Sequence, residues 1–129
     1  MNVRKSFMTG SLIVMLAGAP PAQAAEVVVS RDGWVAGMQD LLPRVFCEDG
    51  SYFRSCFSIT ADACHAKASA TTETCLKQVA PKLPDELRQP EDGRTWGQQV
   101  GRCAGGNFER ELLPKRLNSP KCNDPSQWQ

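Results

Sequence analysis

The chain has 129 residues, a formal net charge of +1 at pH 7 and a hydrophobic content of 41%. Its length suits one domain, and its near-neutral charge provides no global attraction to nucleic acid or to an anionic membrane surface. These properties disfavour a multidomain protein and the function classes that depend on a strongly charged surface.

The N-terminal residues have the three parts of a secretory signal peptide. Arg4 and Lys5 form a basic head, an apolar stretch follows over 8–19, and Ala22-Gln23-Ala24 places small residues where a signal peptidase cleaves. The apolar stretch is shorter than the roughly 20 residues that a membrane-spanning helix needs, and no later apolar run is long enough either. We therefore predict a signal peptide over 1–24, one mature domain over 25–129, and a periplasmic or secreted location.

A first helix is expected to start after Ser30, whose hydroxyl can accept a hydrogen bond from the first helical turn. Apolar residues recur at helical spacing from there to about residue 47, with Pro43 inside the pattern. Proline either kinks such a helix or begins a new turn as its first residue. A Glu-Asp-Gly turn over 48–50 ends this segment, and a short helix is predicted near 51–57.

A longer, alanine-rich helix is predicted over 61–80, because Thr60 is a good N-cap and one apolar face continues to the prolines that follow. Residues 81–94 contain three prolines and are predicted to be a connecting loop with one helical turn at most. The last helix is predicted to start at Thr95, because Thr95 and Gln98 match a capping box.

The fold class that these segments indicate is all-α, as a small disulfide-stapled helical domain of four to five short helices. Strand signals are almost absent after residue 29, and the β-branched lead-in over 25–29 is expected to be extended. The polar tail beyond residue 115 would fray unless Cys122 tied it down.

Six cysteines lie in the predicted mature domain: Cys47, Cys56, Cys64, Cys75, Cys103 and Cys122. An even number of cysteines in an oxidising compartment indicates three disulfides rather than free thiols. No metal site and no cofactor is expected, because the chain has no C-x-x-C pair and His65 is its only histidine.

Helix geometry limits how these cysteines can pair. Cys64 and Cys75 lie on one predicted helix, where they would be about 16 Å apart along the axis. A disulfide requires Cα atoms about 4.4–6.8 Å apart, so this pair is excluded. If the helices over 61–80 and 96–113 pack antiparallel, Cys75 falls beside Cys103, and we predict this disulfide first.

The other two pairings follow from where the remaining cysteines lie along the chain. Cys122 lies beyond the last helix, at the end of the bundle where Cys64 is expected. This leaves Cys47 with Cys56 across the turn at 48–50. We therefore expect Cys64–Cys122 and Cys47–Cys56 as the second and third disulfides.

Three residues are candidates for contact with a partner: Tyr52, Arg54 and Trp128. Tyrosine, arginine and tryptophan are enriched at the centres of protein interfaces. Tyr52 and Arg54 belong to a dense aromatic and basic cluster whose phenylalanines are expected in the core. Trp128, next to the C-terminus, either docks back on the domain or is displayed to solvent, and the sequence leaves both possibilities open.

Any histidine-dependent mechanism would have to use His65. The pair Cys64-His65 resembles the helix of the secreted calcium-dependent phospholipases, in which a catalytic histidine lies among cysteines. The resemblance implies a small hydrolase, but Ala66 stands where those enzymes have an aspartate, and their glycine-rich calcium loop has no clear counterpart. The other interpretation is an exposed, non-catalytic histidine on an amphipathic helix.

Three glycines recur at every fourth residue of the last predicted helix, at Gly97, Gly101 and Gly105. A stripe of small residues lets another helix approach closely. We expect that neighbour to be a helix of the same domain, and a helix of a partner protein is the alternative.

The function that these features favour is protein binding. We expect a non-enzymatic periplasmic or secreted protein of the inhibitor, immunity-protein or envelope-assembly type, with a protein partner and no catalytic residues. One alternative is a phospholipase-like hydrolase that uses His65. Another is a carrier of a small molecule or lipid, which would need a cavity between the helices.

The signal peptide and the even cysteine count make a joint prediction about the exported protein. Its first residue should be Ala25, and it should contain no free thiol. Intact mass before and after alkylation without reduction measures both properties. A mature chain that retains Met1, or that gains alkyl groups without reduction, would contradict the prediction.

Overall fold

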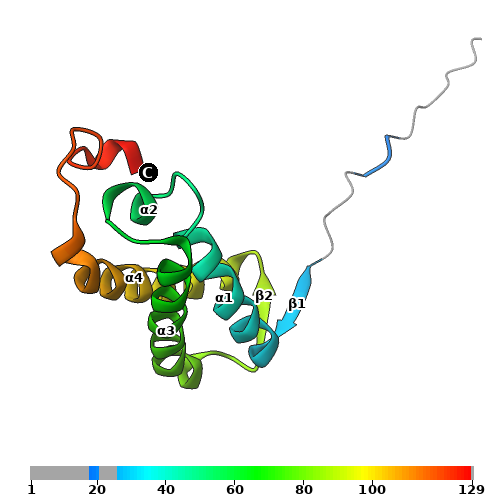
Figure 1. Cartoon of the computed structure of the whole chain (residues 1–129). Coiled ribbons are helices and arrows are strands. Elements are labelled where there is room, and N and C mark those ends of the chain that lie inside the picture. Colours follow the sequence, from blue (N-terminus) through cyan, green and yellow to red (C-terminus); the bar gives the residue numbers. More distant parts are fainter. Residues whose placement is uncertain (1–17, 21–25, 129) are drawn as a thin grey trace, which may run out of the picture.

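The computed structural model describes residues 18–20 and 26–128, so most of the predicted signal peptide lies outside the described residues. The described part contains four α-helices and a two-stranded sheet (Figure 1). The elements in chain order are β1 (Val27–Ser30), α1 (Arg31–Phe46), α2 (Tyr52–Cys56), α3 (Ala61–Val79), β2 (Glu86–Gln89) and α4 (Glu91–Leu112). Short 3-10 turns lie between α3 and β2, after α4 and at the end of the tail, at Ala80–Lys82, Leu113–Lys115 and Pro125–Trp128.

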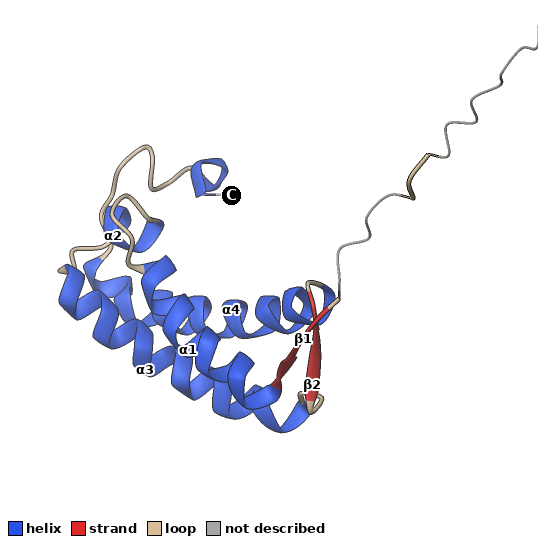
Figure 2. Cartoon of the chain, turned by 90° about the vertical axis from the view of Figure 1, so that its right-hand side faces the viewer, coloured by secondary structure: helices blue, strands red, loops and turns tan. Residues whose placement is uncertain are grey.

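The long helices α1, α3 and α4 pack against one another and form the body of the domain. The sheet lies at one end of this body, while α2 and the C-terminal tail lie at the other (Figures 1 and 2). The predicted fold class, a small helical domain stapled by disulfides, is confirmed.

Side-chain caps start the first three helices where the sequence predicts them. The hydroxyl oxygens of Ser30, Ser51 and Thr60 each accept a hydrogen bond from a backbone N–H in the following turn. Such a bond satisfies one of the N–H groups that a helix start leaves without a partner. Pro43 does not restart the helix as the first residue of a new turn, because α1 continues through it to Phe46.

The prediction of a plain loop over 81–94 is wrong, because Glu86–Gln89 is the strand β2. This strand pairs antiparallel with β1, so that Val28 lies opposite Arg88 and Val29 opposite Leu87. Leu87 is completely buried in the core, and it is the only apolar residue of the strand. A strand with one apolar residue shows no alternation of apolar and polar residues, so the local sequence does not predict it. Pairing with β1 stabilises the extended conformation instead.

The helix α4 begins at Glu91, so the capping box predicted at Thr95 is also wrong. Glu91 and Asp92 lie in the first turn, where carboxylates are stabilised by the helix dipole. The Asp92 carboxylate accepts the backbone N–H of Arg88 at 2.7 Å, which ties the helix start to β2. Thr95 lies one turn inside the helix.

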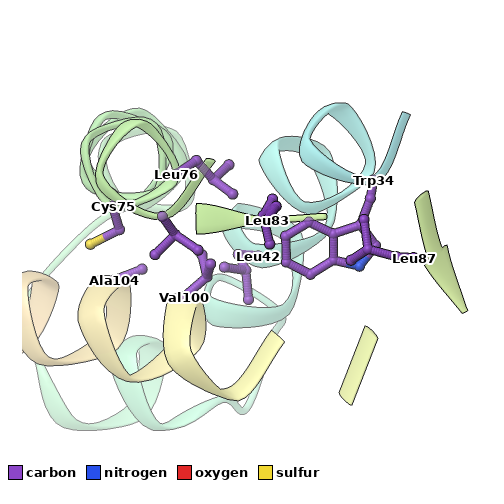
Figure 3. Close-up of a cluster of buried hydrophobic side chains, with 9 residues drawn as sticks. Trp34, Leu42, Cys75, Leu76, Leu83, Leu87, Val100 and Ala104 are labelled. Atoms are coloured by element: carbon purple, nitrogen blue, oxygen red, sulfur yellow. The ribbon is translucent and has the colours of Figure 1, made fainter. Parts of the chain in front are cut away.

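The first of two apolar clusters fills the space between the long helices and the sheet. Leu42 of α1, Leu76 of α3 and Val100 of α4 point toward one another there (Figure 3). Trp34 and Leu87 extend the cluster toward the sheet. Complete burial of one such aliphatic side chain stabilises a fold by roughly 1.5–3 kcal/mol.

The second cluster lies where α2 and the C-terminal tail cover the ends of α1, α3 and α4, and it is largely aromatic. The rings of Phe53 and Phe108 have centroids 4.5 Å apart, and Phe46 stacks on Phe108 at 6.2 Å. These centroid distances are within the range of favourable aromatic pairs. The phenylalanines of the cluster near residue 52 are therefore core residues, as predicted.

The predicted disulfide between Cys75 and Cys103 is confirmed, with a Cα–Cα distance of 5.9 Å. It joins α3 to α4 across the segment that contains β2. Cys64 does not pair with Cys75, which agrees with their placement on one helix.

The other two predicted disulfides are wrong, because the structure pairs Cys47 with Cys64 and Cys56 with Cys122. Cys47 directly follows α1, and the C-terminal end of α1 meets the N-terminal turn of α3, which contains Cys64. Cys56 ends α2 with its side chain buried in the aromatic cluster, where it meets the tail. The predicted location of Cys122 near Cys64 was correct, since both belong to this cluster.

Two of the three glycines of the α4 stripe face α1, a helix of the same domain. A Cβ atom at Gly105 would lie 3.6 Å from the ring of Phe46, and one at Gly97 would lie 3.9 Å from the methyl group of Met38. Gly101 has no such neighbour within 4 Å. Both distances are ordinary van der Waals contacts, so the packing of α4 on α1 would also accommodate a methyl group at the two outer positions.

Removal of the disulfide between α3 and α4 should destabilise the domain strongly. Cys75 and Cys103 are separated by 28 residues, and restriction of a loop of that length in the unfolded chain is worth roughly 3–4 kcal/mol. The double variant Cys75→Ser/Cys103→Ser should lose about that much free energy of unfolding, measured by urea denaturation without reductant. A loss below about 1 kcal/mol would contradict the prediction.

Candidate functional site

A pocket of about 540 Å³ opens between α2, the end of α4 and the C-terminal tail. We call it the Tyr52–Trp128 pocket. Its lining includes Tyr52, Glu109, Arg116, Cys122, Asn123 and Trp128. Tyr52 and Trp128, two of the three residues predicted for partner contact, therefore lie together in it.

The tail that forms one side of this pocket is attached to the end of α2. The disulfide between Cys56 and Cys122 provides the covalent link. Backbone hydrogen bonds run from Leu117 N–H to the Cys56 carbonyl and from Ser58 N–H to the Lys115 carbonyl, at 2.9 and 2.8 Å. These contacts fix the tail against the domain although it contains only short 3-10 turns.

Tyr52 occupies the centre of a polar triad in the pocket. Its hydroxyl donates a hydrogen bond to a Glu109 carboxylate oxygen at 2.7 Å and accepts one from the Arg116 guanidinium at 2.6 Å. Arg116 also donates to the Cys122 carbonyl at 2.9 Å and lies over the Tyr52 and Phe57 rings. One arginine thus connects the tail backbone, the tyrosine and the aromatic cluster.

The surroundings of Tyr52 raise the pKa of its phenol above the usual tyrosine value of about 10. Burial of the hydroxyl is the largest cause, because it disfavours the charged phenolate. The hydrogen bond to Glu109 acts in the same direction, and the Arg116 guanidinium lowers the pKa but does not reverse the shift. Tyr52 is therefore a neutral hydrogen-bond donor at physiological pH.

Trp128 docks back onto the domain, which decides between the two possibilities left open by the sequence. Its ring meets the Tyr52 ring edge-on with centroids 5.4 Å apart. The indole N–H donates to the Lys121 carbonyl at 3.0 Å, and the Lys121 ammonium lies 4.7 Å from the ring centroid. The tryptophan remains half-buried, so part of its face is accessible in the pocket.

Arg54 lies outside the Tyr52–Trp128 pocket, in contrast to the other two predicted contact residues. Its guanidinium donates to the Cys47 carbonyl at 3.3 Å and pairs with the Asp49 carboxylate at 3.2 Å. Arg54 therefore holds the turn between α1 and α2. Residues two positions apart in a helix point in nearly opposite directions, and for this reason the side chains of Tyr52 and Arg54 separate.

Sequence reasoning missed Glu109 and Arg116, the two charged partners of Tyr52. Glu109 lies among alternating charges of α4 that are typical of a solvated helix face. Arg116 follows Pro114 in a polar segment without periodicity. No local signal distinguishes either residue, because their contacts with Tyr52 span 57 and 64 residues of chain.

His65 lies exposed on the first half of α3 and does not line this pocket. The nearest polar side-chain atom in hydrogen-bond range among the described residues is the Ser69 hydroxyl, 3.5 Å from Nδ1.

Within the described residues, no helix is both long and apolar enough to cross a membrane.

The sequence model of one protein family, NttA, matches residues 28–116. The chain belongs to the NttA family. The family is described as NttA, a substrate of the type II secretion system, which identifies the protein as periplasmic or secreted, as predicted. No curated protein and no solved structure matches the chain. The range that matches NttA contains Tyr52, Glu109 and Arg116, and it ends before Cys122 and Trp128.

The triad around Tyr52 predicts opposite shifts for two variants of this NttA-family protein. Glu109→Gln should lower the Tyr52 pKa, because the carboxylate disfavours the phenolate, and Arg116→Gln should raise it, because a favourable positive charge is lost. Tyr52 is the only tyrosine of the chain, so phenolate absorbance during a pH titration reports it alone. Equal shifts in one direction would show that the triad does not form in solution.

Proposed function

We propose that this NttA-family protein is a non-enzymatic secreted protein that binds another protein through the Tyr52–Trp128 pocket. The observation that carries the proposal is the gathering of Tyr52, Arg116 and Trp128 around one accessible pocket. Tryptophan, tyrosine and arginine are the residue types that most often dominate the free energy of protein association.

The rigidity of the pocket supports the same proposal. The Tyr52 hydroxyl and the Arg116 guanidinium are already held by hydrogen bonds, and the disulfide between Cys56 and Cys122 holds the opposite side. A partner would therefore meet side chains that lose little conformational entropy on binding. Such preorganisation favours tight binding from a small contact area.

The composition of the pocket indicates the kind of group that it would accept. The Tyr52 and Trp128 rings offer an apolar surface, while Arg116 and Glu109 offer a charged donor and a charged acceptor beside it. A protruding side chain with an apolar body and a polar tip matches this combination. We therefore expect the partner to insert one aromatic or long polar side chain.

A comparison of four proteins tests the proposal. The wild type, Trp128→Ala, Arg116→Gln and the exposed control His65→Ala would each capture proteins from an envelope extract, with binding of each purified candidate then measured by calorimetry. We expect a partner whose affinity falls at least about tenfold with the Trp128 and Arg116 substitutions and stays unchanged with His65→Ala. Thermal unfolding would establish that all four proteins are folded.

Two outcomes would overturn the proposal. One is that no purified protein distinguishes the wild type from the two pocket variants. The other is an activity on a lipid or ester substrate that His65→Ala abolishes with an unchanged melting curve, which would favour the hydrolase.

A further inference from the structure

The strand β1 pairs only with β2 in the two-stranded sheet, so among the described residues one of its edges has no partner strand. An edge strand presents backbone N–H and C=O groups that can pair with another strand. Proteins usually protect such edges with lysine, proline or a covering segment. The residues of β1 are Val-Val-Val-Ser, which contain neither a charge nor a proline.

The direction of the hydrogen bonds shows which backbone N–H groups of β1 point away from β2. The Arg31 N–H donates to the Asp85 carbonyl at 2.9 Å, which continues the ladder between the strands. Backbone groups alternate in an antiparallel pair, so Val27 and Val29 direct theirs toward β2. Val28 and Ser30 consequently direct their N–H groups to the free edge.

The outer edge of β2 differs from this free edge, because it is already occupied. Arg88 lies opposite Val28, so its N–H also points away from the other strand. This N–H donates to the Asp92 carboxylate at the start of α4. For Val28 no equivalent acceptor is found among the described residues. The sheet can therefore be extended on the β1 side.

The side chains of β1 are unusually exposed for valines. Val27 is 57% exposed and Val28 is 51% exposed. They lie on opposite faces of the strand, so both faces of this edge offer apolar surface. A partner strand with apolar residues on both faces would cover them.

We propose that a second copy of this chain pairs antiparallel with β1, which creates a four-stranded sheet across a two-fold axis at Val28. In this register the Val28 residues of the two copies exchange backbone hydrogen bonds. Val27 of each copy lies opposite Val29 of the other, so every exposed valine is covered by a valine. Interfaces of this type are self-complementary, as two-fold symmetry requires.

The ends of the strand limit which registers are possible. In the proposed register Glu26, whose carboxylate lies 3.9 Å from the Arg88 guanidinium of its own copy, lies opposite the uncharged Ser30 of the second copy. A two-fold axis at Glu26 would place two carboxylates opposite each other, which is destabilising. An axis at Ser30 would direct the strand of the second copy against α1, which begins at the next residue. A register centred on Val27 pairs fewer residues of β1, and one centred on Val29 places the exposed Val27 opposite Arg31, where α1 begins, instead of opposite a valine.

This surface is independent of the proposed function. The sheet lies at the end of the domain away from the C-terminal tail (Figures 1 and 2), so the dimer would leave the Tyr52–Trp128 pocket open. Each dimer would present two such pockets.

Sedimentation velocity of the exported protein over a range of concentrations tests the proposal. The wild type should show a concentration-dependent dimer, and Val28→Pro should abolish it. This substitution removes an N–H that faces outward, and proline is tolerated at such edge positions. Val28→Thr, which keeps the N–H, should still dimerise. A wild type that remains monomeric, or a dimer that persists in Val28→Pro, would overturn the proposal.

Cysteine cross-linking tests the register even if Val28→Pro does not fold. Directly opposed residues in such a pair have Cα atoms about 5.5 Å apart, which is within the range that a disulfide requires. Val28→Cys should therefore give a covalent dimer under mild oxidation. Val27→Cys, similarly exposed but opposite Val29 of the second copy, should give much less. Equal cross-linking of the two variants would overturn the proposed register. No cross-linking in either variant would overturn the dimer.

Discussion

The disulfide between Cys56 and Cys122 is the constraint on which the candidate site depends. It joins the end of α2 to a tail that is 66 residues away in sequence and largely exposed. The tail places the Cys122 carbonyl beside the Arg116 guanidinium and the Trp128 ring beside Tyr52. One covalent bond therefore converts a polar segment into one side of a pocket.

The three disulfides are distributed unequally between the two ends of the domain. Two of them lie at the aromatic end, while the disulfide between Cys75 and Cys103 lies beside the aliphatic cluster. A domain of this size has a modest core, so cross-links in the unfolded chain contribute a large share of its stability. The end that contains the pocket is the more heavily cross-linked one, which is consistent with a preorganised binding surface.

The two exposed surfaces differ in the physics of recognition that they offer. The Tyr52–Trp128 pocket presents side chains: two aromatic rings and a charged triad whose geometry is already formed. The edge of β1 presents backbone groups, which accept any extended segment and obtain specificity from the side chains beside them. The first surface suits a particular partner side chain, whereas the second suits a strand such as β1 itself.

The helical fold follows from local features, and for this reason it could be predicted. Ser30, Ser51 and Thr60 cap helices whose apolar faces repeat at the helical period, and both signals lie within one or two turns of chain. The pairing of Cys75 with Cys103 could also be predicted, because it needs only two antiparallel helices. The strand β2 could not, since its only apolar residue is Leu87 and its pairing partner lies some 60 residues earlier, a separation that no local pattern spans.

The sequence by itself therefore determined the starts of the first three helices, the paired state of its cysteines and two of the residues in the pocket. Only the tertiary structure decided that Cys56 pairs with Cys122, that Glu109 and Arg116 meet at Tyr52, and that Trp128 docks on the domain. The physical reason is the range of the interactions. Capping and apolar periodicity act over a few residues, whereas these contacts depend on how the packed helices bring distant segments together.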